Sequence, residues 1–352
     1  MIYLGSGQVW SPEGAGIVAD YQIDNGAASG GALAVGCNLA ADRASFIAVA
    51  GGGQGYIWYS HQISTGARLG MAQFGNIAGN ITDLIQAGSS YIAIRTDAGE
   101  AAVIPASLLE ASVGGNPLRQ LSSAAGGVPM LAPGSLAAAY ATTGTSLATG
   151  QPAAPGLPWP TSLEGTTVTI VDSTGASVQA PLTYVSSSQV NFQIPASVAI
   201  GLATVTVTSG NGTTATGHAT LTLLAPSIFA LNATNLAAAY AACVSSGGTV
   251  TTEDPFQVVN GALVAQPLNL SACAQTILEL YGTGMDKATA SNVQVMFGDV
   301  AGTVQYAGPG GGYPGLDQVN VVIPQSLAGS GIVPIVLSAG GMTANTVNVT
   351  IE

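Results

Sequence analysis

The side chains that could carry acid–base, nucleophilic or metal chemistry are scarce in this sequence. Its 352 residues include only two histidines, His61 and His218, and three cysteines. A zinc site takes about four nitrogen or sulfur ligands, and neither a third nitrogen ligand nor a cysteine pair accompanies the histidines. A Ser-His-Asp triad needs a histidine beside a nucleophile, and no nucleophile-elbow pattern occurs. We therefore expect no catalytic residue, no metal and no cofactor, and so no enzyme.

The carboxylates allow two further kinds of site. Glu253 and Asp254 form the only adjacent acidic pair. Glycosidase-type pairs are assembled in space and not in sequence, but a solvated loop tip explains this pair better. Asp97, Glu100 and Asp172 stand beside glycine-containing turns, where oxygen ligands could hold calcium. Aspartate at such places is also ordinary turn chemistry, because its side chain bonds the local backbone. The turn interpretation is favoured, and bound calcium stays open.

The cysteines allow one covalent link. Cys243 and Cys273 flank a polar excursion and could join its two ends in a disulfide, whereas Cys37 is far away in the sequence. Closing a loop of about 30 residues would gain roughly 3–4 kcal/mol in the chain-entropy model, provided that the chain is secreted into an oxidising compartment. The alternative is that all three cysteines are small buried apolar residues. The disulfide between Cys243 and Cys273 is the one site that we predict.

Aromatic residues in the first third could form a carbohydrate platform. Trp10 and Trp58 occupy the same register of a repeat, and Trp58 stands beside Tyr56 and Tyr59. The competing interpretation is an aromatic side chain that fills the core of a β-sheet repeat, and it is the favoured one. Separately, five asparagines lie in N-x-S/T sequons, which we interpret as exposed polar turns. They are Asn80, Asn211, Asn232, Asn269 and Asn348.

Two copies of one β-unit follow the first third of the chain. Residues 189–195 read Gln-Val-Asn-Phe-Gln-Ile-Pro, and residues 318–324 read Gln-Val-Asn-Val-Val-Ile-Pro. After each copy come a glycine-containing turn and alternating runs rich in Val, Ile and Thr, which are typical of antiparallel strands with one buried face. We predict an all-β fold with two tandem immunoglobulin-like β-sandwiches, over residues 129–225 and 226–352.

The first third, residues 1–128, has its own period of about 45 residues. Ile2, Ile47 and Ile92 stand at matching places in three units, each with a strand, a glycine-rich turn and a second strand. This spacing is typical of four-stranded propeller blades, but three units cannot close a propeller of about four to eight blades. The region is therefore either the end of a larger propeller with its other blades upstream, or an open β-meander that something else completes.

Charge is scarce over the whole chain. Charged residues make up 6% of it, against about 25% in ordinary soluble proteins, and the net charge is −12 with Lys287 as the single lysine. The lack of a basic patch argues against nucleic-acid binding and against an anionic membrane surface. Although the mean hydropathy is +0.45, no run reaches the roughly 18 apolar residues of a spanning helix. A surface so poor in charge suits close contact between identical subunits and an extracellular setting.

Several short motifs stand between residue 131 and residue 352. They include Ala-Pro-Gly-Ser at 132–135, Pro-Thr-Ser-Leu-Glu-Gly-Thr-Thr-Val at 160–168, Leu-Tyr-Gly-Thr-Gly at 280–284, Gly-Leu-Asp-Gln-Val-Asn at 315–320 and Ala-Asn-Thr-Val at 344–347. In these motifs the chain resembles an uncharacterised C-terminal domain family of large secreted surface proteins from soil bacteria of the acidobacterial type. The resemblance implies paired immunoglobulin-like modules on an exported protein, often behind propeller-type repeats, and no known catalytic activity. One departure is Glu164, where the family usually has glycine.

These patterns predict an extracellular structural or cell-surface protein that acts by self-assembly, as a fibre or surface layer, or by surface attachment. The alternative is a carbohydrate- or surface-binding adhesion module at the C-terminal end of a larger secreted propeller protein. We expect further copies of the chain as partners, in a homo-oligomer or homopolymer, with a glycan as the alternative ligand and without nucleic acid or membrane insertion. The first residues lack the basic and apolar regions of a signal peptide, so we expect such a signal to be removed or upstream.

The expected assembly contact lies at open sheet edges. Exposed edges with few charges are templates for pairing with another chain. We expect the N-terminal region of one copy to contact a sandwich of the next, and a head-to-tail contact that does not close into a ring gives a filament. Blades upstream in the same polypeptide would cover these edges equally well, and this alternative stays open.

Overall fold

The fold is all-β, as the alternating runs of the sequence predict. Regular structure consists of β-sheets, almost entirely antiparallel, and two short 3-10 turns; α-helix is absent from the described part of the chain. The computed structural model describes residues 2–3, 8–11, 16–20, 34–38, 40, 43–49, 56–62, 68–74, 80–87, 91–105, 116–127, 130–142 and 144–352.

The chain divides into two compact units. One comprises residues 1–121, 139–190 and 202–220, and the other comprises residues 122–138, 191–201 and 221–352. Each unit thus contains segments that are distant in the sequence. The three-part division that we predict from the sequence, with boundaries near residues 128 and 225, stays a prediction.

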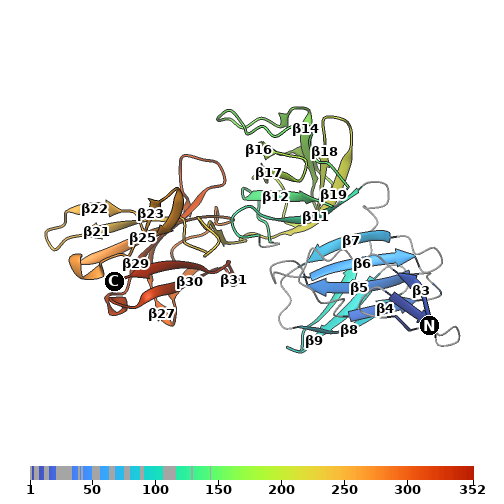
Figure 1. Ribbon diagram of the computed structural model, residues 1–352, viewed down its shortest axis with the longest axis horizontal. Helices are drawn as coiled ribbons and strands as arrows, with labels where there is room; N and C mark the ends of the chain where they lie inside the picture. Colours follow the sequence, from blue (N-terminus) through green and yellow to red (C-terminus); the bar gives the residue numbers. More distant parts are fainter. Residues whose placement is uncertain are drawn as a thin grey trace. The chain divides into compact units, whose positions relative to one another are not determined.

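Short antiparallel meanders make up the described part of the first third. Strands that follow one another in sequence are neighbours in each sheet, and the sheets are β1-β2-β3, β4-β5-β6-β7 and β10-β9-β8 (Figure 1). The strands are β1 (Ile2–Tyr3), β2 (Gln8–Ser11), β3 (Gly16–Asp20), β4 (Ala34–Asn38), β5 (Arg43–Val49), β6 (Tyr56–Gln62), β7 (Arg68–Phe74), β8 (Ile81–Ala87), β9 (Tyr91–Thr96) and β10 (Ala101–Pro105).

Two of the three matched isoleucines lie on comparable strands, while the repeat of three blade-like units stays a prediction. Ile47 lies in β5 and Ile92 in β9, each on the second strand of its sheet. Both side chains are fully buried and belong to one hydrophobic core, which also holds Trp58. Ile2 lies in β1, whose side chains are outside the described residues.

A single mixed sheet contains the strands that follow. Its order is β13-β14-β18-β19-β11-β12-β17-β16, and β15 pairs with β14. In β14, Val168 and Ile170 are buried while Thr167 and Thr169 occupy the other face, so the Val/Ile–Thr alternation decides which side faces the core. The strands are β11 (Asn116–Ser123), β12 (Leu136–Ala141), β13 (Ser162–Leu163), β14 (Thr166–Val171), β15 (Ser177–Gln179), β16 (Leu182–Val185), β17 (Gln189–Gln193), β18 (Gly201–Thr208) and β19 (Thr214–Leu221).

Residues 227–351 form a β-sandwich of two sheets around one core (Figure 1). One sheet has the order β22-β21-β25-β29-β28, with β20 on β25; the other has the order β27-β26-β30-β31, with β32 on β30. The elements are β20 (Ser227–Ile228), β21 (Ala239–Val244), β22 (Val250–Glu253), β23 (Phe256–Val259), β24 (Ala262–Ala265), η1 (Leu270–Ala272), β25 (Gln275–Thr283), β26 (Val293–Phe297), β27 (Val300–Ala301), β28 (Thr303–Pro309), β29 (Asp317–Ile323), η2 (Gln325–Leu327), β30 (Gly331–Ala339), β31 (Met342–Thr343) and β32 (Val347–Ile351).

The two copies of the repeated motif occupy strands at comparable places in their sheets. β17 lies between β12 and β16, as β29 lies between β25 and β28. Asn191 and Asn320 are both half-buried between fully buried apolar neighbours, so the two strands have the same burial phase. Both copies of the motif therefore occupy an interior strand of a sheet and share the same core-facing positions.

Candidate functional site

His218 is the histidine whose side chain the structure describes. The side chain is buried, and its Nδ1 lies 3.2 Å from Oγ1 of Thr204. Burial lowers the pKa of the imidazole, which therefore stays neutral near pH 7. The His61 side chain lies outside the described residues. Within the part of the chain that is described, no three His, Cys, Asp or Glu side chains gather as a metal site would require.

The aspartates beside glycine-containing turns hydrogen-bond groups of the protein. Asp97 accepts hydrogen bonds from the backbone N–H of Asn80 at 2.7 Å and from its side-chain amide at 3.0 Å, and these bonds lower the pKa of Asp97. Asp172 accepts from the backbone N–H groups of Thr174 and Ala176 and from the Thr174 hydroxyl. The Asp172 contacts are the local turn contacts that the sequence favours, whereas the partner of Asp97 lies 17 residues earlier in the chain.

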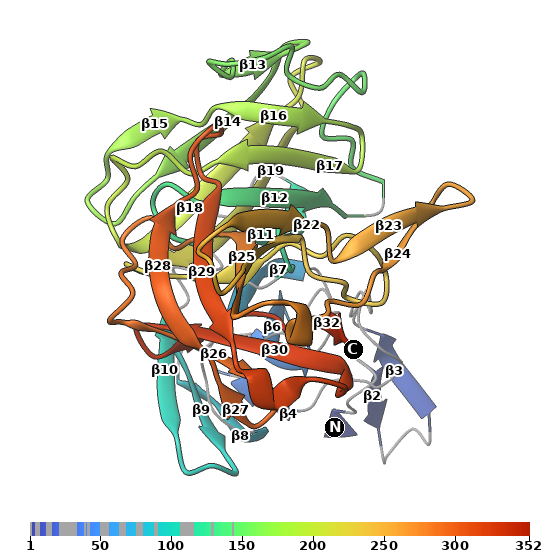
Figure 2. The same ribbon diagram turned by 90° about the vertical axis from the view of Figure 1, so that its left-hand side faces the viewer.

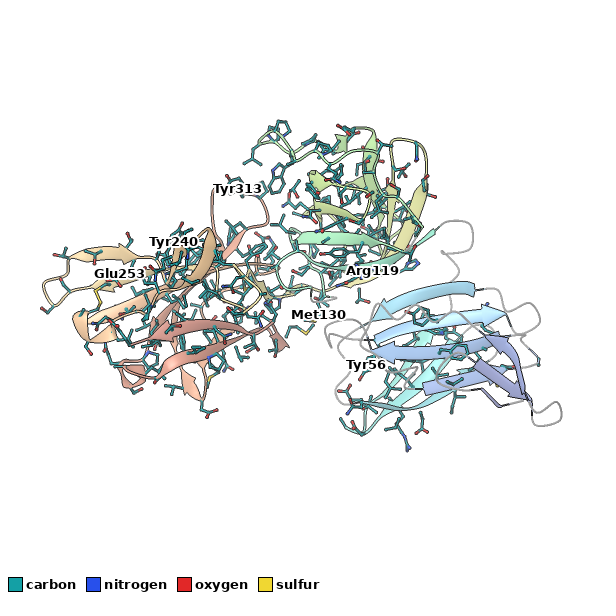
Figure 3. All side chains as sticks on the ribbon, in the orientation of Figure 1. Tyr56, Arg119, Met130, Tyr240, Glu253 and Tyr313 are labelled. Atoms are coloured by element: carbon teal, nitrogen blue, oxygen red, sulfur yellow. A yellow bond between two sulfur atoms is a disulfide. The ribbon has the colours of Figure 1, made fainter. Side chains whose placement is uncertain are left out.

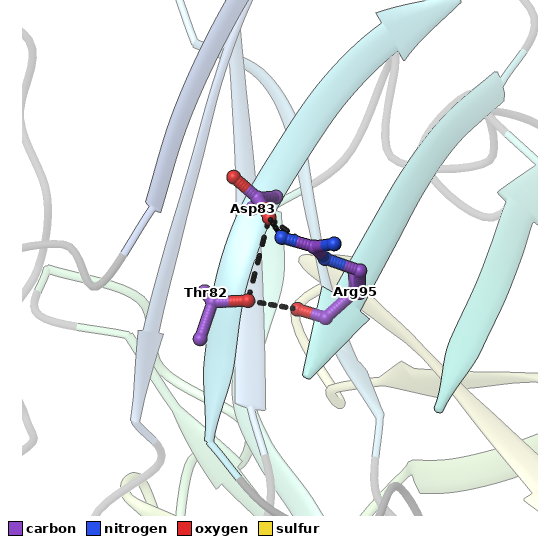
Figure 4. A network of polar contacts seen from close by, with 3 residues as sticks. All are labelled: Thr82, Asp83 and Arg95. Carbon is purple, nitrogen blue, oxygen red and sulfur yellow. Dashed lines mark hydrogen bonds and ion pairs between the residues drawn. The ribbon is translucent and has the colours of Figure 1, made fainter. Parts of the chain in front are cut away.

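Three further acidic groups, Asp83, Glu253 and Asp254, are exposed. Glu253 ends β22 and is exposed, as is Asp254 after it. Asp83 makes a cross-strand ion pair with Arg95, in which Nη2 lies 2.6 Å and Nε 2.9 Å from Oδ2 (Figure 4). Both partners are exposed, and such pairs contribute about 0–1 kcal/mol. This pair therefore contributes little to stability.

The asparagines of the five sequons bond other protein groups, and not all of them lie in exposed turns, since Asn348 is half-buried in β32. Asn232 donates to the Leu263 carbonyl and accepts three hydrogen bonds from Thr234 and Leu236. Asn269 caps η1 through the Ala272 N–H. Asn80, Asn211 and Asn348 likewise bond protein groups through their side chains.

Trp58 is a core residue, so the interpretation of this side chain as a carbohydrate platform is wrong. It is fully buried, and its Nε1 donates to Oγ of Ser45 at 2.9 Å. Tyr56 and Tyr59 beside it are buried too. The competing interpretation, an aromatic ring that fills the core of a sheet repeat, is confirmed for Trp58. The Trp10 side chain lies outside the described residues.

Cys243 and Cys273 come together as a disulfide, with their Cα atoms 5.4 Å apart. Cys243 lies in β21 and Cys273 follows η1, just before β25. The bond therefore closes the base of the excursion that carries β22, β23 and β24. Cys37 is a free, exposed thiol.

The excursion ends in a hairpin that forms a sheet of its own. β23 and β24 pair only with each other within the described residues, and Figure 2 shows them projecting from the rest of the sandwich. Asn260 and Gly261 connect them with positive φ of 52° and 80°, the geometry of a type I′ turn. We call residues 256–265 the free hairpin.

Both faces of the free hairpin carry apolar side chains. The register pairs Val258 with Leu263 on one face and Gln257 with Val264 on the other. Val258 is 67% exposed and Val259 44%. The nearest charged residues in the sequence are Glu253 and Asp254, both acidic.

The free hairpin has a sequence signal that is easy to overlook. Asn-Gly between two apolar runs is the strongest short-range sign of a hairpin, and residues 258–263 read Val-Val-Asn-Gly-Ala-Leu. The exposure of Val258 and Val259 has no such signal, because exposure depends on what else packs against the strands.

The motifs that carry the family resemblance bear structural contacts. Thr283 accepts a hydrogen bond from the Leu136 N–H at 2.8 Å and donates to the Gly315 carbonyl at 2.7 Å. Asn345 accepts from the Ile228 N–H and donates to the carbonyl of the same residue, at 2.9 Å each. Asp317 is buried and accepts from the Met285 N–H at 2.5 Å. These contacts hold the backbone together and point to no reaction.

No protein-family model matches the sequence, and no curated protein matches it. Among solved structures the chain is similar to SGBP-B of the Bacteroides ovatus mixed-linkage glucan utilization locus, in complex with a mixed-linkage heptasaccharide. The identity is 13%, the TM-score is 0.29, and the match covers 74% of this chain and 52% of the other. The chain thus spans about half of that structure.

A second solved structure to which the chain is similar is that of domains 5–6 of the S-layer protein SbsC. The identity is 14%, the TM-score is 0.22, and the match covers 66% of this chain and 94% of the other. Both TM-scores are below 0.5, so neither similarity carries an argument about function. Among the described residues, no helix is long and apolar enough to cross a membrane.

Proposed function

We propose that this chain is an extracellular structural protein that acts at a surface by self-assembly and has no catalytic role. The observation that supports this proposal best is the free hairpin. A two-stranded hairpin alone is marginally stable in water, and this one exposes valines at its centre. A strand from a second copy would cover one edge and part of one face.

The edge of β23 in the free hairpin lacks the usual protection against pairing, whereas on β24 the Leu263 carbonyl already accepts a hydrogen bond from Asn232. Natural edge strands carry lysine, proline or a bulge that prevents edge-to-edge association. The strands β23 and β24 contain no charged residue and no proline, and their register is regular. Strand addition between copies is the association mode that such an edge permits.

Two further observations support the extracellular setting. Disulfides persist in oxidising compartments and are rare in the cytosol, and Cys243 and Cys273 are joined. The chain has 17 acidic and 5 basic side chains, so contact between copies desolvates few charges. The sequence also suggests contacts between copies through the N-terminal sheets. Further blades upstream in the same polypeptide are the alternative, and both remain hypotheses.

Lysines on the free hairpin test this function. The double variant Val258→Lys/Val259→Lys places two charges on the hairpin, so strand addition would bury or oppose them. We expect the assembly to shift to monomer in sedimentation velocity at micromolar concentration. The matched control is Ile332→Lys, at a residue that is 74% exposed on β30, between β26 and β32.

The control should leave assembly unchanged, since Ile332 lies outside the free hairpin, opposite Thr350 of β32. If the double variant sediments like the wild type while circular dichroism shows both folded, the free hairpin is not the contact.

A further inference from the structure

The outer face of the sheet β22-β21-β25-β29-β28 presents an ordered row of side chains. The register places Tyr240 of β21 opposite Glu279 of β25, Glu279 opposite Asn320 of β29, and Asn320 opposite Tyr306 of β28. Residues directly opposite one another point to the same face. The neighbouring row, Ala239, Leu280, Val319 and Ala307, is buried in the core, so this row must point outward.

The two ends of the row are exposed aromatic rings. Tyr240 is 45% exposed and Tyr306 40%, and Tyr240 is labelled in Figure 3. Three inter-strand steps of about 4.8 Å separate them, so the row is about 14 Å long. We call the row, with Tyr281 and Gln318 beside it, the tyrosine face.

A β-bulge directs Tyr306 to the tyrosine face. Val304 pairs with Val321 and Tyr306 with Asn320, so Gln305 is the extra residue of β28. If the strands paired regularly from Val304 onward, Gln305 would lie opposite Asn320, and Tyr306 would lie opposite Val319 and point into the core. Bulges are over-represented beside functional sites, where they redirect a side chain.

The ring of Tyr306 is fixed in place. Its hydroxyl donates to the Pro309 carbonyl at 2.7 Å. A Cβ added to Gly308 would lie 3.3 Å from the Tyr306 hydroxyl oxygen and 3.6 Å from its Cζ. The Tyr306 ring therefore lies along the strand, over Gly308, which has no side chain. A ring held in advance loses little conformational entropy when it binds.

Tyr240 is supported by a second tyrosine. Its ring meets that of Tyr281 edge to face, with centroids 5.9 Å apart and planes at 84°, a favoured geometry for aromatic pairs. Burial, followed by the charge of Glu279, raises the pKa of Tyr281, so its hydroxyl stays protonated near pH 7.

Between the rings lie groups that both donate and accept hydrogen bonds. Gln318 Nε2 donates to Asn320 Oδ1 at 2.7 Å and lies 3.4 Å from Glu279 Oε2. Amides and carboxylates in such a cluster have further donor and acceptor sites than these bonds use. The tyrosine face therefore combines apolar rings at its ends with fixed polar groups at its centre.

We propose that the tyrosine face binds an uncharged, extended polysaccharide. A pyranose ring has an apolar C–H face, which stacks on an aromatic ring, and a rim of hydroxyls, which amides and carboxylates bond in pairs. The flat row matches an extended chain. Because Glu279 is the one charged side chain in the row and the protein's net charge is −12, anionic polymers are repelled. The face is separate from the free hairpin, so binding does not depend on self-assembly.

Affinity gel electrophoresis of the folded full chain tests this proposal. The uncharged extended probes are hydroxyethylcellulose and galactomannan, and the anionic probe is polygalacturonate. We expect at least one uncharged polymer to retard the protein and polygalacturonate not to retard it. In Tyr240→Ala and in Tyr306→Ala the apparent Kd should rise about tenfold or more, as when an aromatic anchor is truncated.

The matched control is Tyr91→Ala, which removes another exposed tyrosine, 48% exposed on β9. It should bind like the wild type, and so should Val258→Lys/Val259→Lys, which separates this proposal from self-assembly. Circular dichroism establishes that each variant is folded. The proposal is overturned if neither uncharged polymer retards the protein, if polygalacturonate retards it equally, or if both tyrosine variants bind normally.

Discussion

Asp317 is a carboxyl group buried for a structural purpose. It accepts the Met285 N–H at 2.5 Å, and burial, reinforced by the nearby carboxylate of Asp286, raises its pKa to about 7 against the opposing effect of backbone hydrogen bonds. Asp286 itself pairs with Lys287 at 2.6 Å. In the sequence Asp317 belongs to a motif of the family resemblance, and the structure gives the motif a physical role at the start of β29.

We expect the free energy of unfolding to fall as the pH rises from about 4 to about 7. The pKa of Asp317 is about 7 when folded, against about 3.9 in an unfolded chain. Over this interval the folded state keeps a proton that the unfolded chain has released. The stabilisation that this proton gives to the folded state is therefore complete below about pH 4 and is lost as the pH passes about 7. Asp317→Asn, which keeps an oxygen for the Met285 N–H, should flatten the slope. Urea unfolding at pH 5 and pH 8 measures it.

Asp172→Asn is the control for this titration. Asp172 is half-buried in a turn and accepts backbone hydrogen bonds as Asp317 does, but its turn contacts do not require a proton. It should retain the wild-type difference between pH 5 and pH 8. If the free energy of unfolding of Asp317→Asn changes between pH 5 and pH 8 as much as that of the wild type, the pH dependence does not come from Asp317.

Glu164 marks a residue where the sequence and the backbone are in conflict. Its φ is 46°, in the left-handed region that favours glycine. The conformation of this residue therefore suits glycine better than glutamate.

At the scale of the elements, the disulfide fixes the base of the segment that carries the free hairpin. Cys243 pairs in register with Thr276 of β25, and Gln325 Nε2 donates to the carbonyls of Leu270 and Cys273 at 3.2 Å. The base of the excursion is thus held by one covalent bond and by a side chain from η2.

Removal of the disulfide should destabilise the folded protein. We expect Cys243→Ala/Cys273→Ala to lower the free energy of unfolding by about 2–4 kcal/mol, because the unfolded chain regains the freedom of a loop of about 30 residues. Urea unfolding measures the change. Cys37→Ala should have no effect, since that thiol is free and exposed. Non-reducing peptide mapping that finds Cys243 and Cys273 free in secreted material would contradict the pairing.

The sequence predicts where the strands lie better than it predicts which of their residues are exposed to solvent. The alternation in β14, β17 and β29 identified buried faces correctly because it is a local pattern. The bulge at Gln305 has no comparable signal, since it is defined by which residue of β29 lies opposite. The tyrosine face likewise depends on a register that joins four strands, and sequence spacing alone does not give it.

For the whole molecule, the sequence predicts an all-β fold correctly and the candidate site only in part. It identified the two cysteines that pair, because their spacing encloses a polar segment. Trp58 stands out among the aromatics in the sequence, whereas the exposed rings of the tyrosine face are those of Tyr240 and Tyr306. Aromatic residues of both kinds occur in strands, and tertiary packing alone decides which of them face solvent.

The central claim is self-assembly through unprotected strand edges, and sedimentation velocity of the mature native protein tests it most directly. Measured over a micromolar concentration series, the weight-average sedimentation coefficient should rise with concentration, and electron microscopy of the same samples should show fibres or particles. Edge-to-edge association is a mass-action equilibrium, so dilution should reverse the rise. A compact monomer at every concentration, with neither fibres nor particles in the images, would contradict the claim.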